Sequence, residues 1–203
     1  MEEKNITERE SLAIIQQMIQ TAKQVHSERG NGWLLWGWLL FLSSSLSVIF
    51  SYTGMMEYIS YVWNAMLVAV LVGFILERVI KRKQGEVKTY IQVLLDRIGA
   101  GFFISLFCLI AATILFNNVK PSDYTFSFGY YYILYAFWMF IHGSAIHFRP
   151  LIIGAFVNWA AGIAMFVVTE FRYDMMISAA AILIGYLIPG YLLRAAHRKR
   201  SVV

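Results

Sequence analysis

Apolar residues in this 203-residue chain fall into six stretches that short polar segments separate. Each stretch is close to the roughly 20 residues that an α-helix needs to cross about 30 Å of hydrocarbon. Helices are expected because a chain that crosses lipid must pair its backbone groups internally. The pattern predicts an all-α, polytopic membrane protein, a six-transmembrane-helix bundle with spans at about 33–52, 58–79, 98–116, 129–146, 151–169 and 175–193.

The polar segment before the first span predicts an N-terminal amphipathic helix. At about 100° per residue its apolar side chains share one face, and glutamines occupy the opposite face. Lipid, an apolar stripe from Val87 to Leu95, or another protein can cover that face. Lipid is the weakest of these covers because residues 1–29 carry five acidic and only four basic groups. The candidate partner face consists of Leu12, Ile15, Met18, Ile19 and Ala22.

Positive charges are distributed unevenly between the loops. With six spans, 15 of the 17 Lys and Arg residues lie on one side, and only Lys120 and Arg172 lie on the other. Short loops rich in Lys and Arg stay in the cytoplasm. We therefore expect a multi-pass protein of the cell inner (plasma) membrane with both termini in the cytoplasm. It divides into a leader helix at 1–30, a transmembrane domain at 31–194 and a basic tail at 195–203.

The composition supports this class and narrows the alternatives. Hydrophobic residues make up 59% of the chain and charged residues 14%, whereas soluble domains have about 25% charged residues. The net charge of +5 then reflects topology, and no nucleic-acid partner is expected. No cleavable signal peptide is expected, because an acidic polar segment precedes the first apolar run. The single cysteine, Cys108, excludes an intrachain disulfide.

Three polar side chains lie within the predicted spans, namely Asn64, His142 and Asn158. Each is read either as an interhelical hydrogen bond, worth about 0.6 kcal/mol on average, or as a contact with a ligand or substrate. No Asp, Glu, Lys or Arg lies in the middle of a span, which argues against ion-coupled transport. His142 and His147 do not have the spacing of a paired metal site, and neither a metal nor another cofactor is expected.

The sequence His142-Gly143-Ser144 in the fourth span resembles intramembrane serine proteases of the rhomboid type, which also have six spans and a serine in the fourth. Those proteases need a histidine in the sixth span as general base. The sixth span of this chain has none, because His197 lies beyond its end. No catalytic residue is therefore assigned, and the protein is not expected to be an enzyme.

Small residues recur at helical spacing in four spans, which allows close approach of helices. We interpret these stripes as packing within the bundle, with contact between copies as the alternative. They are Ser44, Ser47 and Ser51; Ala65, Ala69 and Gly73; Gly154, Asn158 and Gly162; and Ala181 with Gly185. Pro189 predicts a kink in the sixth span, because it removes one backbone hydrogen bond.

The chain resembles a group of small six-span bacterial membrane proteins found in Bacteroidetes. The resemblance covers most of the chain and is carried by the segments Phe148–Gly154, Gly185–Leu193, Ser11–Gln20 and Trp36–Trp38. That group has no assigned activity. Its members are often encoded near winged-helix regulators, which implies a regulatory setting and no particular reaction.

These features favour an integral inner-membrane protein that acts, without enzymatic activity, in interaction or regulation. The alternative is a transporter or channel component for a neutral or apolar small molecule. The lipid bilayer is the expected partner, while a protein partner at the leader and a homo-oligomer stay open. A polar cavity that reaches Asn158 would favour transport, and a closed bundle would favour partner binding.

Overall fold

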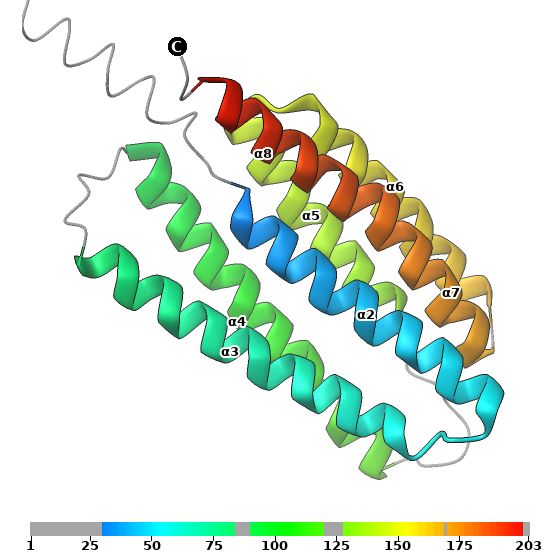
Figure 1. Ribbon diagram of the computed structural model, residues 1–203. Helices are drawn as coiled ribbons and strands as arrows, with labels where there is room; N and C mark the ends of the chain where they lie inside the picture. The colour runs from blue at the N-terminus through cyan, green and yellow to red at the C-terminus, as the bar shows by residue number, and fades with distance from the viewer. Residues whose placement is uncertain (1–29, 84–89, 120–127, 169, 201–203) are drawn as a thin grey trace, which may run out of the picture.

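The computed structural model describes residues 30–83, 90–119, 128–168 and 170–200 (Figure 1). The predicted leader helix, with its face from Leu12 to Ala22, lies outside these residues, as does Val87. Within the described residues the chain is helical and contains no strand. Its elements are α2 (Asn31–Thr53), α3 (Tyr58–Lys83), α4 (Tyr90–Val119), α5 (Gly129–Ala145), α6 (Arg149–Val167), α7 (Phe171–Ile182), the π-helical turn η1 (Leu183–Leu187) and α8 (Ile188–Arg200).

The helical structure of the described residues confirms the all-α class. Four helices are long and apolar enough to cross a membrane, which is compatible with an integral membrane protein. They run over Gly32–Thr53, Tyr90–Phe116, Arg149–Val167 and Phe171–Arg198. Of the two other predicted spans, α3 has 26 residues with an apolar part at Tyr58–Gly73, and α5 has 17 residues. Six spans therefore stay a prediction.

Five helices pack into a tight group, and α3 and α4 lie at its side (Figure 1). The group consists of α2, α5, α6, α7 and α8. α5 packs along α6, α2 packs along α7, and the helix formed by α7, η1 and α8 joins the two pairs. Outside this group, α3 packs on α2 and α4 packs on α5. Gly30, before α2, lies against the backbone of Gly190 and Arg194 in α8, so the two ends of the described chain meet at one end of the bundle.

Two tight turns fix neighbouring helices as hairpins. After α2, Gly54 adopts a left-handed conformation with φ of 77°, and the Met55 N–H donates to the Phe50 carbonyl at 3.0 Å. This is the helix-ending geometry that favours glycine. After α5, His147 takes a φ of 54°, and the Phe148 N–H donates to the Gly143 carbonyl at 2.8 Å. The tight hairpin predicted after the first span is thus present.

Aromatic rings fill the space between α2, α4 and α5. The Phe102 ring of α4 stacks on Trp138 of α5, with centroids 5.5 Å apart. Trp36 of α2 meets Phe103 and Tyr135 edge-on, each at 6.0 Å between centroids. Large rings let helices whose backbones are not in close contact still bury apolar surface between them. Only 17% of the residues in the apolar part of α4 are buried, and Phe102 is one of them.

Glycines allow α6 to approach the last helix closely. A methyl group at Gly154 would overlap with the Gly185 carbonyl oxygen, so the two backbones are in contact here. The last helix bulges at this point into η1, where the Ile188 N–H donates to the Leu183 carbonyl five residues earlier. Pro189 has no N–H to donate to the Gly185 carbonyl, four residues before it. The predicted proline effect therefore takes the form of a π-helical turn.

Candidate functional site

Asn158 lies where α6 crosses η1, and none of its surface is exposed. Its Nδ2 donates to the Gly154 carbonyl oxygen at 2.8 Å and lies 3.5 Å from the Met139 Sδ on α5. Gly185 faces the amide so closely that a methyl group there would overlap with it. These contacts engage the amide nitrogen, whereas Oδ1 is buried and accepts no hydrogen bond from the described residues, so the role of Asn158 as a packing residue stays a prediction.

His142 is buried in α5 between two tryptophan rings. The centroid of its ring lies 5.1 Å from that of Trp33 and 5.2 Å from that of Trp138. Ser144 follows two residues later and is exposed. At about 100° per residue the two side chains leave the helix on opposite sides. They therefore do not form a nucleophile–base pair, which needs hydrogen-bond contact.

Asn64 lies on α3, and its side chain is exposed. The three polar residues that the sequence singled out thus sit on three different helices, in three different surroundings. The structure brings none of them into one site: Asn158 contacts glycines and a methionine, His142 contacts tryptophans, and Asn64 faces out of the bundle.

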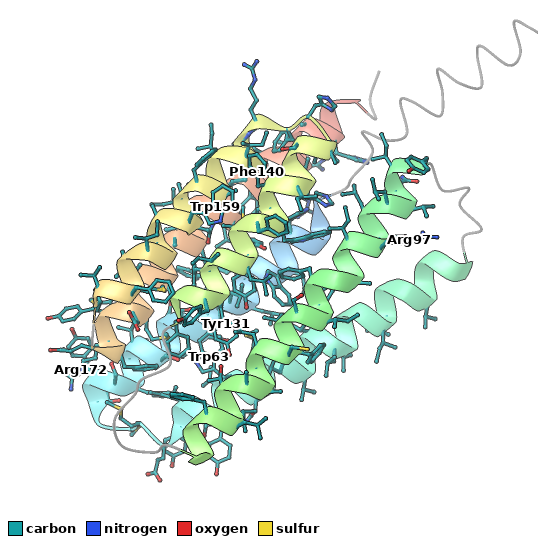
Figure 2. All side chains as sticks on the ribbon, turned by 180° about the vertical axis from the view of Figure 1, so that it is seen from behind. Trp63, Arg97, Tyr131, Phe140, Trp159 and Arg172 are labelled. Atoms are coloured by element: carbon teal, nitrogen blue, oxygen red, sulfur yellow. The ribbon has the colours of Figure 1, made fainter. Side chains whose placement is uncertain are left out.

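A different set of polar residues does come together, in the half of the bundle near the α2–α3 turn. The Ser44 Oγ of α2 and the Ser178 Oγ of α7 share a hydrogen bond of 2.6 Å. The Tyr132 hydroxyl of α5 also bonds to Ser178. Trp63, labelled in Figure 2, points from α3 toward α2, and its Nε1 donates to the Ser47 Oγ at 3.1 Å. We call these five residues the polar cluster.

The polar cluster ties four helices together through side-chain hydrogen bonds. Its serines and Tyr132 are buried, so their hydroxyl groups need hydrogen-bond partners within the protein. Bonds of this kind between membrane helices average about 0.6 kcal/mol, so three of them contribute about 2 kcal/mol. The serine stripe predicted on the first span is therefore packed inside the bundle.

One acidic residue lies one helical turn from the polar cluster. Asp174 lies in the first turn of α7, and only 7% of its surface is exposed. Its backbone N–H donates to the Glu170 carbonyl at 3.2 Å, but in the described part of the chain its Oδ1 accepts no hydrogen bond. Asp174 precedes Ser178 by four residues, so both occupy the same face of α7.

The predicted sixth span starts at about residue 175, which leaves Asp174 in the preceding loop. In the structure α7 starts at Phe171, and its first turn is already packed against α2. The sequence does contain one indication of this site: the spacing of Asp174 and Ser178 puts two polar side chains on one face of a helix. Their alignment with Ser44 depends on how α2 and α7 pair, which no local pattern encodes.

The chemistry of this region rests on oxygen atoms. Hydroxyl and carboxyl oxygens bind protons and hard cations, and they are not the histidine and cysteine donors of a zinc site. Among the described residues no group of three or more His, Cys, Asp or Glu side chains is placed to hold a metal ion. Comparison with protein families, with curated proteins and with solved structures finds no match for this chain.

Proposed function

We propose that this chain is a six-span protein of the cell inner membrane, with both ends in the cytoplasm, that acts without enzymatic activity by binding another membrane helix. We further propose that this helix is α3 of a second copy of the chain. The distribution of Lys and Arg supports the orientation. The meeting of Gly30 with Arg194 supports an even number of crossings.

The observation that carries the proposal is the outward face of α3. Six consecutive positions of one helical stripe are exposed there: Tyr61, Asn64, Ala65, Val68, Ala69 and Val72. At 100° per residue they cover about 140° of the helix. Gly73, the third member of the predicted small-residue stripe, instead packs inward, since a methyl group there would lie 3.2 Å from Leu35 of α2. The stripe is thus divided between the bundle and the surface.

An amide on a lipid-facing surface is unfavourable. Asn64 lies six residues into α3, about 9 Å below its outer end, among apolar side chains. In hydrocarbon its amide has no water to bond with, so pairing with another polar group gains free energy. Ala65 and Ala69 form a small-xxx-small pair beside it, which lets a second helix come close enough for that bond.

A second copy fits this face better than a helix of different sequence. An asparagine amide has both donors and an acceptor, so two Asn64 side chains can bond to each other reciprocally. A two-fold dimer brings the same patch of both subunits together. The amide pair contributes about 0.6 kcal/mol, and close packing of Ala65 and Ala69 contributes the remainder.

The experiment compares three variants in lipid vesicles at low protein density, with the number of copies counted by single-molecule photobleaching. Asn64→Leu removes the amide, and Ala65→Leu blocks close approach. Ala160→Leu is the matched control, because Ala160 is exposed on α6, away from the α3 face. Wild type and Ala160→Leu should be dimers, and both α3 variants should shift toward monomers. Monomeric wild-type protein, or dimers unaffected by either α3 variant, would refute the proposal.

A further inference from the structure

Asp174 carries a buried carboxylate oxygen that no described residue pairs. Its Oδ1 is fully covered, and in the described part of the chain it accepts no hydrogen bond. A carboxylate oxygen buried without a partner is unfavourable, so the group gains free energy by binding a positive charge or by losing its own charge. An acidic group inside a membrane-crossing helix is for this reason a candidate functional site.

Among the described residues, the charged and titratable groups of the elements packed against α7 do not supply that partner. α2, against which α7 packs, contains no Asp, Glu, Lys, Arg or His, and its one titratable side chain is Tyr52. Arg172, on α7 itself, is engaged elsewhere: its guanidinium carbon lies 5.3 Å from the centroid of the Tyr52 ring. α6 carries only Arg149, at its far end, and η1 contributes Tyr186. Tyr132 of α5 bonds to Ser178, while Tyr173 and Glu170 are exposed.

Two contacts define how α2 and α7 are aligned. Ser44 meets Ser178, and Tyr52 meets Arg172, so the helices run antiparallel. Asp174 lies about 6 Å along the axis from Ser178 toward the start of α7. That position corresponds to the level between Ser47 and Ser51 on α2, which are both buried.

The hydroxyl groups at this level have acceptor capacity left. A serine hydroxyl has one donor and two lone pairs. The Ser51 hydroxyl donates to the Val48 carbonyl of its own helix at 2.8 Å, and the Ser47 hydroxyl donates to the Ser43 carbonyl at 2.8 Å. Ser51 thus keeps both lone pairs for a cation, whereas Ser47 uses one to accept from Trp63.

We propose that Asp174 and the serine face of α2, at the level of Ser47 and Ser51, form a binding site for a monovalent cation. The cation is a proton or Na⁺, and both meet the same need for a positive charge on the buried carboxylate. Oxygen donors from carboxylate and hydroxyl groups suit a hard cation. The inference does not depend on the α3 contact proposed above, because the site lies between α2 and α7.

The test follows thermal unfolding of the full-length purified protein in detergent. One series exchanges choline chloride for NaCl at constant ionic strength and pH, and a second lowers the pH without Na⁺. Asp174→Asn keeps the shape and removes the charge, and Glu170→Gln removes a neighbouring exposed carboxylate as the matched control. A ligand at ten times its dissociation constant raises the midpoint by about 3–6 °C in wild type and Glu170→Gln.

The two series separate the two cations. A rise with Na⁺ at fixed pH identifies Na⁺ as the ligand. A rise only as the pH falls identifies the proton, since a folded chain that binds the proton more tightly loses stability as the pH increases. In either case the response is absent in Asp174→Asn. If wild type responds in neither series, or if Asp174→Asn responds as wild type does, the site does not exist.

A second measurement avoids dependence on the folding of the variant. Dicyclohexylcarbodiimide reacts with protonated carboxyl groups in apolar surroundings, and mass spectrometry locates the modified residue in wild-type protein. We expect labelling at Asp174 that falls as Na⁺ or pH rises, to one third or less of its starting level. No labelling of Asp174 under any condition, or labelling that neither Na⁺ nor pH changes, would overturn the proposal.

Discussion

Replacing Gly154 with alanine tests the backbone contact between α6 and η1. The added methyl group would overlap with the Gly185 carbonyl oxygen and lie 2.9 Å from the Met139 Cε. The methionine end can move, but the carbonyl belongs to the backbone of the neighbouring helix. The two helices must therefore separate by part of the width of a methyl group, which also weakens the packing around Asn158.

The size of the effect follows from two opposing terms. Extra volume in a packed core costs about 1–3 kcal/mol, and a rigid backbone neighbour places this site at the upper end. Alanine in a helix interior gains about 0.5–1 kcal/mol over glycine. We expect Gly154→Ala to lower the free energy of unfolding by about 2 kcal/mol.

Gly101→Ala is the matched control. Gly101 lies inside α4, and nothing lies within 4 Å of the methyl group that alanine would add. This variant should therefore gain about 0.5–1 kcal/mol from helix propensity alone. Both are measured by reversible unfolding in mixed micelles against wild type. If Gly154→Ala is as stable as Gly101→Ala, the close contact of α6 with η1 is refuted.

Three further substitutions test single contacts. Tyr132→Phe removes the hydroxyl that bonds to Ser178 and should cost about 1 kcal/mol in the same unfolding assay; no loss would mean that the bond does not contribute. Asn158→Leu should change stability by no more than about 2 kcal/mol, and a functional effect on an intact fold would show that Asn158 does more than pack. Pro189→Ala supplies an N–H opposite the Gly185 carbonyl, so the new amide at position 189 should exchange slowly with deuterium; rapid exchange would contradict the origin assigned to η1.

The helical pattern was predictable because it follows from local composition. Apolar stretches of about 20 residues located the helices, and Gly54 located a tight turn, as the structure confirms. Helix boundaries were less accurate. The last predicted span starts at about residue 175, whereas α7 begins at Phe171, because this helix continues beyond its apolar part.

The polar cluster and Asp174 were not predictable, because they depend on the pairing of helices distant in the sequence. Ser44 and Ser178 meet across α2 and α7, 134 positions apart. The same limit applies to the small-residue stripes. Gly154 and Gly185 are buried between helices, whereas Ala65 and Ala69 are exposed. Small residues recur at the same helical spacing in both cases. Whether such a stripe is buried or exposed depends on whether another helix packs against it.

The most direct test of the six-span membrane topology uses reporter fusions that distinguish the two sides of the membrane, placed at residues 55, 84, 120, 172 and 203. Six spans with both ends inside predict that positions 55, 120 and 172 report the outside, and that 84 and 203 report the inside. If α3 and α5 do not cross, as a chain with only the four longest spans requires, positions 84 and 120 exchange sides. That exchange would contradict the account, while the alternating result would support all six crossings and the membrane-embedded α3 face on which the proposed dimer depends.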